Sequence, residues 1–166
     1  MAESEYSFSF DISKCVQCHA CEVACKIHNS IETGCSWRKV RTFWYGEYPE
    51  ISNKTVSISC IHCKDPECVK ICPEKAISKN SNGIVLVERD QCSGCGSCFD
   101  ACPVGAPQFG KDGIMHKCDL CRNRLEMGEN PICFSTCPGG AIGFEVVNVE
   151  DKVKFENEMA EYFSIK

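Results

Sequence analysis

The residues best suited to chemistry lie in the central stretch 92–107, which reads CSGCGSCFDACPVGAP. Its first three cysteines stand three positions apart, and the fourth, Cys102, follows one helical turn later and precedes a proline. Three thiolates at this spacing can bind one cubane iron-sulfur cluster if the backbone curls tightly around it. Gly94 and Gly96 permit that curl because glycine adopts left-handed conformations without strain. The spacing therefore predicts an iron-sulfur site.

The position of Cys102 predicts a second motif elsewhere in the protein. When two clusters share such motifs, the fourth cysteine ligates the neighbouring cluster. Three further stretches have related spacing, and they read CVQCHACEVACK (15–26), CIHCKDPECVKICP (60–73) and KCDLC…PICFSTCP (117–138). The first has a lysine where the central motif has proline, and the second has a wider gap between its second and third cysteines. Both changes leave the iron-binding pattern in place.

The last motif is open to a second interpretation. Eleven residues separate its second and third cysteines, and two such separated pairs also bind zinc. We favour iron because the motif ends in CxxxCP followed by Gly-Gly-Ala-Ile, which repeats the endings of the other motifs.

Counting the cysteines predicts four [4Fe-4S] clusters. The four motifs use 16 of the 17 cysteines and leave Cys35, for which we expect a buried free thiol rather than an iron ligand. His19, His28, His62 and His116 are alternative ligands or proton carriers. Because the set of cysteines is complete, we expect none of them to bind iron.

The short segment between the second and third motifs makes these two the obvious inner pair, which leaves the first and last motifs for each other. The predicted ligand sets are Cys60, Cys63, Cys68 with Cys102; Cys92, Cys95, Cys98 with Cys72; Cys15, Cys18, Cys21 with Cys137; and Cys118, Cys121, Cys133 with Cys25. The domains expected are an inner dicluster unit, 55–110, inserted into an outer dicluster unit formed by 1–54 and 111–166.

The composition limits the class of protein. A chain of 166 residues with 17 cysteines has neither the short length nor the apolar leader expected of a secreted disulfide scaffold. We therefore expect a soluble cytoplasmic protein whose cysteines bind metal, with no direct membrane insertion. The net charge of -5 argues against a nucleic-acid partner. Since the hydrophobic fraction of 43% includes the cysteines, little conventional core remains, and cluster assembly is expected to accompany folding.

The fold class expected is α+β: two ferredoxin-like units of short hairpins and short helices wrapped around the clusters. Alternation and turn residues predict strands at 6–10, 55–59, 76–78, 84–88, 107–109, 114–116 and 141–147, and an amphipathic helix at 150–163. The segment 37–48 is rich in aromatic and basic residues. We expect it to cover a cluster, with contact to a partner or a quinone as the alternative.

These motifs, in this order, resemble the four-cluster electron-transfer subunits of molybdenum and tungsten bis-pterin oxidoreductases, typified by the dimethyl sulfoxide reductase iron-sulfur subunit. The resemblance rests on CHACEVACKIHN, CIHCKDPECVKICPEKAI, CSGCGSCFDACPVGAP and KCDLCRNRLEMGENPICFSTCPGGAI and covers nearly all of the chain. It implies a similar ligand pairing and a non-catalytic role in an oxidoreductase complex.

The family resemblance also implies partners. The expected partners are a larger molybdenum- or tungsten-pterin catalytic subunit and a soluble electron donor or acceptor such as ferredoxin or a flavoprotein subunit. The short chain resembles compact subunits that accompany tungsten aldehyde oxidoreductase-type enzymes, including those that reduce aromatic acyl thioesters. A free-standing polyferredoxin, a hydrogenase-linked carrier and a zinc-bound scaffold are the alternatives.

Overall fold

Short strands and helices make up residues 4–164, the part of the chain that the computed structural model describes. The strands form four two-stranded antiparallel sheets within this range. The elements are β1 (Ser4–Phe10), η1 (Ile12–Lys14), α1 (Ala20–His28), β2 (Lys39–Tyr45), β3 (Ser52–Ile58), α2 (Glu67–Ile71), β4 (Ile77–Lys79), β5 (Val85–Val87), η2 (Arg89–Gln91), α3 (Ser97–Asp100), β6 (Gln108–Phe109), β7 (Met115–His116), α4 (Arg122–Glu126), α5 (Ile132–Ser135), β8 (Ile142–Asn148) and α6 (Val149–Ser164). This arrangement confirms an α+β protein of short hairpins and short helices.

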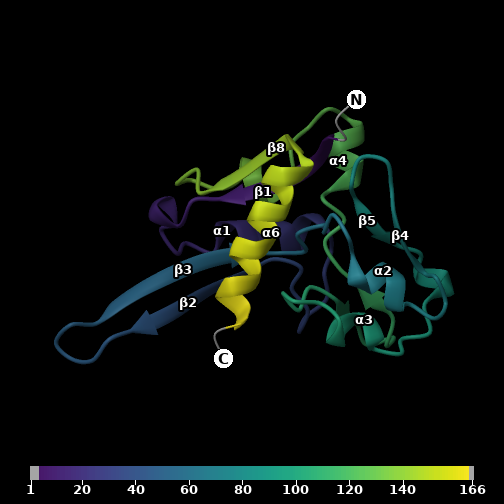
Figure 1. Ribbon diagram of the computed structural model, residues 1–166, viewed down its shortest axis with the longest axis horizontal. Coiled ribbons are helices and arrows are strands. Elements are labelled where there is room, and N and C mark those ends of the chain that lie inside the picture. The colour runs from purple at the N-terminus through teal and green to yellow at the C-terminus, as the bar shows by residue number, and fades with distance from the viewer. Residues whose placement is uncertain (1–3, 165–166) are drawn as a thin grey trace.

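The two ends of the chain are paired with each other. β1 runs antiparallel to β8, with Phe8 opposite Phe144 in the register. Their rings lie 5.8 Å apart at the centroids, and Tyr6, also in β1, stacks on Phe144 at 5.4 Å. α6 packs against both strands, as Figure 1 shows. The strands predicted near both termini and the terminal helix are therefore confirmed.

The terminal helix buries part of one face, as its apolar spacing predicts. Met159 is 2% exposed and belongs to the main core, which Phe155 and Tyr162 also contact. Val153 is exposed, so it does not contribute to this face. The side chain of Phe163, also assigned to the apolar face, lies outside the part that the structure describes.

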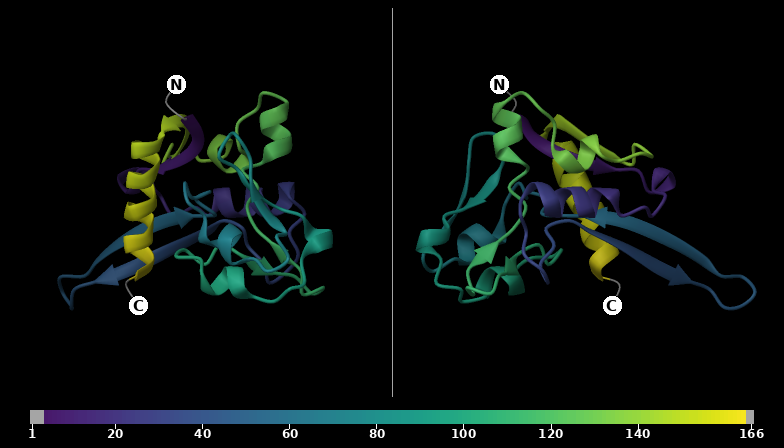
Figure 2. Two further views of the ribbon diagram at one scale, coloured as in Figure 1. Left: turned by 45° about the vertical axis from the view of Figure 1, so that its right-hand side comes forward. Right: turned by 180° about the vertical axis from the view of Figure 1, so that it is seen from behind.

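The hairpins predicted in the middle of the chain are present. β4 pairs with β5 across a turn in which the Asn80 side chain accepts hydrogen bonds from the backbone of Asn82 and Ile84. Gly83 completes this turn with a φ of 80°. β6 pairs with β7 in the second hairpin. In Figure 2 the β4–β5 hairpin, α2 and α3 gather on the side of the molecule away from the β2–β3 hairpin.

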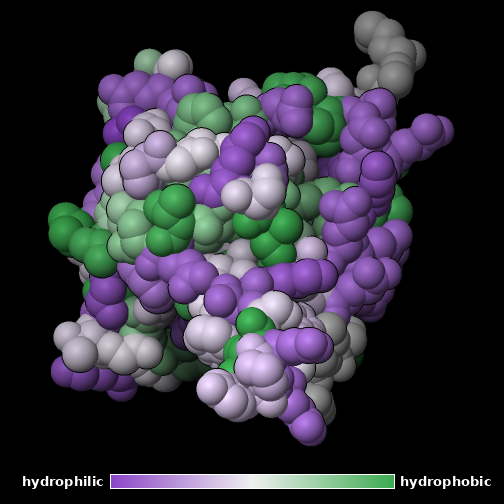
Figure 3. Space-filling view, turned by 90° about the vertical axis from the view of Figure 1, so that its left-hand side faces the viewer, coloured by the Kyte–Doolittle hydropathy of each residue, from purple (hydrophilic) through white to green (hydrophobic). Residues whose placement is uncertain are grey.

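The β2–β3 hairpin projects from the body, and this corrects one expectation in part. Trp37, Val40 and Phe43 do cover the core, and Val40 lines a cavity between the first and last cysteine motifs. Trp44 and Tyr48 are 68% and 89% exposed, although the aromatic pattern predicted a cover over a cluster. Figure 3, which views this side of the molecule, shows apolar residues in green scattered among hydrophilic ones. Aromatic side chains indicate contact with an apolar surface, but they do not say whether that surface belongs to the same chain.

A buried ion network joins β1, α6 and the β4–β5 region. The Glu5 carboxylate accepts hydrogen bonds from Lys152, from Lys79 at 2.8 Å and from Lys64 at 3.2 Å. Lys152 is fully buried and Glu5 is 7% exposed. Burial alone would raise the pKa of Glu5, but the hydrogen bonds from Lys152 and Lys79, the Lys152 charge and the Lys64 contact lower it to about 2. The ionised carboxylate thus stabilises the fold above its ordinary pKa of 4.5, and this contribution is lost as the pH falls toward 2.

Replacing Glu5→Gln should lower the free energy of unfolding by about 3 kcal/mol, because it leaves the Lys152 ammonium buried without its counter-charge. Anaerobic denaturant unfolding at neutral pH, followed by circular dichroism, measures this loss. Glu126→Gln is the matched control, since Glu126 pairs with Arg122 at 3.6 Å on an exposed helix face. Equal stability of the two variants would show that the ion network does not stabilise the packing of β1, α6 and the β4–β5 region.

Candidate functional site

All four cysteine motifs share one backbone feature. The residue before the second cysteine is left-handed in each of them: Gln17 (φ 57°), His62 (φ 50°), Gly94 (φ 71°) and Leu120 (φ 62°). Left-handed backbone is uncommon for residues other than glycine, so its recurrence at one motif position indicates a local geometry that the surrounding structure imposes. In the last motif this curl lets the Leu120 amide donate to Cys118 Sγ at 3.4 Å.

The helices that follow these loops pack in pairs. α1, which carries Cys21 and Cys25, packs against α5, which carries Cys133. α2, which carries Cys68, packs against α3, which carries Cys98. The first motif therefore lies beside the last, and the second lies beside the third, which is the order of pairing that the motif spacing favoured.

Two cavities are lined by cysteines from two motifs each. A cavity of about 180 Å³ is lined by Cys60, Cys63 and Cys68 from the second motif and by Cys102 from the third. Another, much smaller cavity is lined by cysteines of the first and last motifs. Those four are Cys15, Cys18, Cys21 and Cys137. The four cysteines that line each cavity are the four members of one predicted ligand set, and we name each group by its first cysteine.

Cys92, Cys95 and Cys98 of the third motif interact electrostatically with Cys72 of the second motif, and these four residues are the Cys92 group. Burial raises the pKa of Cys98 to about 11, and the neighbouring thiolates of Cys92, Cys95 and Cys72 act in the same direction. Such repulsion acts over short distances, so it indicates that the fourth cysteine of the second motif lies beside the first three of the third motif.

The cysteines of the Cys118 group, which are Cys118, Cys121, Cys133 and Cys25, also lie close together. Burial raises the pKa of Cys25 to about 12; the Arg38 charge opposes this, and the thiolates of Cys133 and Cys121 add to it. Burial also raises the pKa of Cys118, with repulsion from Cys25 and Cys133. Protonated thiols in such surroundings must lose their protons when they bind a metal.

Neighbouring groups of cysteines also interact, and these contacts give the groups an order. Burial raises the pKa of Cys68 to about 11, and Cys98 of the adjacent group contributes repulsion. Cys60 contributes to the raised pKa of Cys118, after burial and Cys25. Cys133 likewise contributes to the raised pKa of Cys21, for which burial is the largest cause. These interactions link the Cys92 group to the Cys60 group, the Cys60 group to the Cys118 group, and the Cys118 group to the Cys15 group.

Hydrogen-bond donors in the interior are consistent with sites that hold an iron-sulfur cluster. Within residues 4–164, Arg38 Nε and His62 Nε2 are buried without a hydrogen-bond partner. His62 Nδ1 accepts from the Val85 amide at 3.0 Å, so the neutral ring carries its proton on the unpartnered Nε2. Such donors are costly unless an acceptor is supplied, and cluster sulfur is one. The amides of Ala106 and Ala141 similarly donate to Cys102 Sγ and Cys137 Sγ, each at 3.3 Å.

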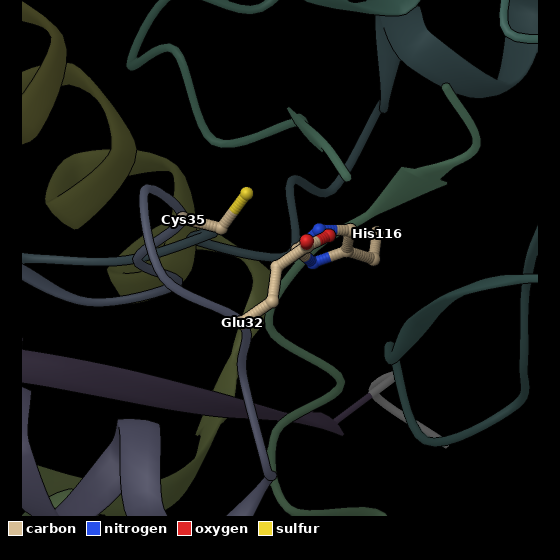
Figure 4. A group of neighbouring side chains, drawn as sticks. All are labelled: Glu32, Cys35 and His116. Atoms are coloured by element: carbon tan, nitrogen blue, oxygen red, sulfur yellow. The ribbon is translucent and has the colours of Figure 1, made fainter. Parts of the chain in front are cut away.

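Cys35 lies in a separate polar cluster with Glu32 and His116, shown in Figure 4. Their potential ligand atoms all lie within 4.8 Å of one another. However, His116 Nδ1 accepts a hydrogen bond from Trp37 Nε1, so the neutral ring carries a proton on Nε2 and offers no free lone pair. Cys35 is 7% exposed, and its thiol donates to the Phe109 carbonyl at 3.4 Å. These bonds favour a hydrogen-bonded contact over a fifth metal site, and the burial of Cys35 agrees with the expectation.

Three basic residues that lie near the motifs in sequence make hydrogen bonds or ion pairs with groups other than the cysteine sulfurs. Lys26 donates to the Cys35 carbonyl at 2.8 Å, Lys70 pairs with exposed carboxylates, and Arg122 pairs with Glu126.

Two buried cations, Arg38 and Lys117, were not among the residues predicted from the sequence. They are 3% and 4% exposed. Lys117 donates to the carbonyls of Val85 and Cys118 and lines the cavity of the Cys60 group. The sequence places Lys117 directly before Cys118 and Arg38 within the aromatic and basic segment 37–48, but it does not show that either side chain is buried.

Comparison with known proteins agrees with this site. Residues 51–147 match a 4Fe-4S dicluster domain, and residues 12–36 match a 4Fe-4S binding domain. The first match extends over the last motif, for which the sequence alone left zinc open. The B subunit of anaerobic dimethyl sulfoxide reductase from Escherichia coli is 39% identical over 150 residues, which cover 85% of this protein and 73% of the relative.

Two other relatives are similar to the protein over comparable lengths. The B subunit of anaerobic dimethyl sulfoxide reductase from Haemophilus influenzae is 37% identical over 154 residues, which cover 87% of this protein and 75% of the relative. The formate dehydrogenase iron-sulfur subunit of Wolinella succinogenes is 34% identical over 164 residues, covering 85% and 81%. The protein therefore belongs to the family of 4Fe-4S electron-transfer subunits that includes the dimethyl sulfoxide reductase B subunit and the formate dehydrogenase iron-sulfur subunit.

Proposed function

We propose that this chain holds four [4Fe-4S] clusters and relays single electrons to or from a larger molybdenum- or tungsten-pterin catalytic subunit. The observation that carries the proposal is the cavity lined by Cys60, Cys63 and Cys68 of one motif and Cys102 of the next. A shared site of this kind is the arrangement found in two-cluster ferredoxins.

The proposed domains are two ferredoxin-like dicluster units. The inner unit, 55–110, contains the packed helices α2 and α3 and the β4–β5 hairpin. The outer unit, 1–54 with 111–166, contains the packed helices α1 and α5 and the pair β1–β8. The predicted boundaries cut through β3 and the β6–β7 hairpin, so the two units share backbone structure at their junction.

The proposed ligand sets are the four groups of cysteines predicted from the motif spacing. When bound, the clusters supply the one-electron chemistry. The residues of the chain hold the clusters, exclude water with the surrounding apolar core, and donate hydrogen bonds to sulfur. Because each group interacts with the next, an electron can pass along them from the Cys92 group through the Cys60 and Cys118 groups to the Cys15 group.

The exposed aromatic residues favour a subunit over a freely diffusing polyferredoxin or a hydrogenase-linked carrier. Trp44, Tyr48 and Ile51, the last 53% exposed, lie on or beside the projecting β2–β3 hairpin. Tryptophan and tyrosine are enriched where proteins contact one another, so their exposure on a projecting element supports a contact with another protein. The relatives, each named as one subunit of a reductase or a dehydrogenase, support the same interpretation.

Among residues 4–164, no helix is long and apolar enough to cross a bilayer.

Anaerobic purification from the native cell, followed by iron, sulfide, molybdenum and tungsten analysis, tests the proposal. We expect about sixteen irons per chain and one molybdenum or tungsten on a larger companion subunit. A ferredoxin or a flavoprotein subunit is the proposed soluble partner, and reduction of the complex by either protein tests that assignment. Sixteen irons on a solitary chain would favour the mobile carrier, and a colourless, zinc-loaded protein would overturn the proposal.

The exchange of fourth ligands predicts which cluster each cysteine variant alters. Cys102→Ser should change the same electron paramagnetic resonance signal as Cys63→Ser, although Cys102 belongs to the third motif. Cys72→Ser should instead change the signal altered by Cys95→Ser. Each variant should lose about one iron or shift one potential, because one of four thiolates is replaced. If Cys102→Ser and Cys95→Ser alter the same signal, each motif binds its own cluster and the pairing is wrong.

Cys35→Ala should leave the iron content unchanged at about sixteen per chain, because the Cys35 thiol already donates to the Phe109 carbonyl and belongs to none of the ligand sets. Iron analysis and visible absorption of the anaerobically purified variant measure this. Cys133→Ala is the matched control, a buried cysteine of the fourth set that should lose iron. Loss of iron in both variants would assign a metal to the Glu32, Cys35 and His116 cluster.

A further inference from the structure

Arg38 is a buried charge without a carboxylate partner. It is 3% exposed, and within the described part of the chain its hydrogen bonds go to the Ser57 carbonyl, the Ser57 hydroxyl and the Ser59 hydroxyl at 3.3, 3.2 and 2.9 Å. The Phe8 ring covers the guanidinium at 4.6 Å. Serine oxygens and an aromatic face do not neutralise a full charge removed from water, so a stable fold requires another source of negative charge nearby.

The nearest source of negative charge is the cysteines of the outer pair of motifs. Burial lowers the pKa of Arg38, but the thiolates of Cys133, Cys118, Cys21 and Cys25 outweigh it and raise that pKa above its ordinary value. Three of these cysteines belong to one proposed ligand set and Cys21 belongs to the other. The geometry agrees: Ser57, which binds the guanidinium, lines the cavity of the Cys15 group, and α1, which carries Cys21 and Cys25, packs on α5, which carries Cys133. The guanidinium is therefore close to both outer sets.

The hydrogen bonds of Arg38 also determine where the hydroxyl protons point. A guanidinium only donates, so Ser57 Oγ accepts from Arg38 and keeps its own hydrogen for another acceptor. That acceptor is Cys21 Sγ, 3.3 Å away, because a thiolate bound to iron has no hydrogen to donate. Ser59 Oγ likewise accepts from Arg38 and donates to the Cys60 carbonyl at 3.3 Å. Arg38 thus acts on the Cys21 sulfur through Ser57.

We propose that Arg38 sets the reduction potentials of the two outer clusters, through its charge on both and through the Ser57 hydroxyl on the cluster held by Cys15, Cys18, Cys21 and Cys137. Reduction adds one electron, and so one negative charge, beside the guanidinium. A fixed positive charge and a hydrogen bond to ligand sulfur both stabilise that added charge. Within residues 4–164 the Arg38 Nε is buried without a hydrogen-bond partner, so the guanidinium keeps a donor in reserve. This proposal rests on the ligand sets proposed above.

Redox titration of the anaerobic holoprotein, followed by electron paramagnetic resonance, tests the role of Arg38. Arg38→Gln removes the charge and should lower the potentials of both outer clusters. At the wild-type midpoint, the ratio of reduced to oxidised cluster should then fall about tenfold or more. Arg41→Gln, in the same strand, is the matched control: it removes an equal charge from an exposed position, where solvent screens it, and should leave that ratio within about twofold.

Two further variants separate the charge from the hydrogen bond. Ser57→Ala keeps the charge but removes the donor to Cys21, so it should lower the potential of the Cys15 cluster alone. Arg38→Lys keeps the charge without the planar fork, so its potentials should lie between those of the wild type and Arg38→Gln. Cys137→Ser and Cys25→Ser identify the two outer signals, because each removes one ligand of one outer cluster.

The outcomes distinguish the two proposals. Fewer than four clusters in the wild-type protein would overturn the ligand sets. Four clusters whose potentials are the same in Arg38→Gln and Arg41→Gln would overturn the role of Arg38 alone. If Arg38→Gln does not assemble its clusters, the potential of the Cys15 cluster in Ser57→Ala tests the proposal, and an unchanged potential in that variant would overturn it.

Discussion

The structure depends on one geometric constraint, that several thiolates must converge on one point without leaving room for water. A loop curled around a left-handed residue can present three cysteines to such a point, and a fourth must come from another motif packed against it. The packed helix pairs α1–α5 and α2–α3 bring these motifs together, with the fourth cysteine in or just after a helix of each motif. The core follows from this requirement, since buried cysteines and aliphatic residues such as Val56 and Leu120 occupy the same cluster. We therefore expect metal binding and folding to be coupled.

A second consequence of the constraint is electrostatic. Burying many thiolates concentrates negative charge in the interior, and the fold places buried cations next to it. Arg38 and Lys117 lie beside cysteine groups, whereas Lys152 faces the Glu5 carboxylate and joins distant parts of the chain. The same kind of side chain thus serves two physical purposes, and its nearest anion decides which. In the first case the cation acts on the site, and in the second it acts on the stability of the fold.

The sequence predicted much of this architecture, because its signals are local. The left-handed turn at Gly83, the alternation in β1 and β8 and the spacing of the cysteines each follow from a few adjacent residues. The projecting tip of the β2–β3 hairpin and the site of Arg38 were not predictable in this way. Trp44 and Trp37 are both aromatic, yet one is exposed and the other packs on the core. Their burial depends on which distant segments pack beside them, and no pattern within the segment encodes that choice.

The pairing of β1 with β8 has a consequence for how the protein is made. During synthesis the first motif leaves the ribosome long before the strand and helix that complete its surroundings. The inner segment is contiguous, so its hairpin and its packed helices can form while the remaining residues are still being added. The outer half has to wait for β8 and α6, with its early cysteines exposed to oxidants and to stray metals. A cell that makes this protein must protect those thiols until both elements have been synthesised.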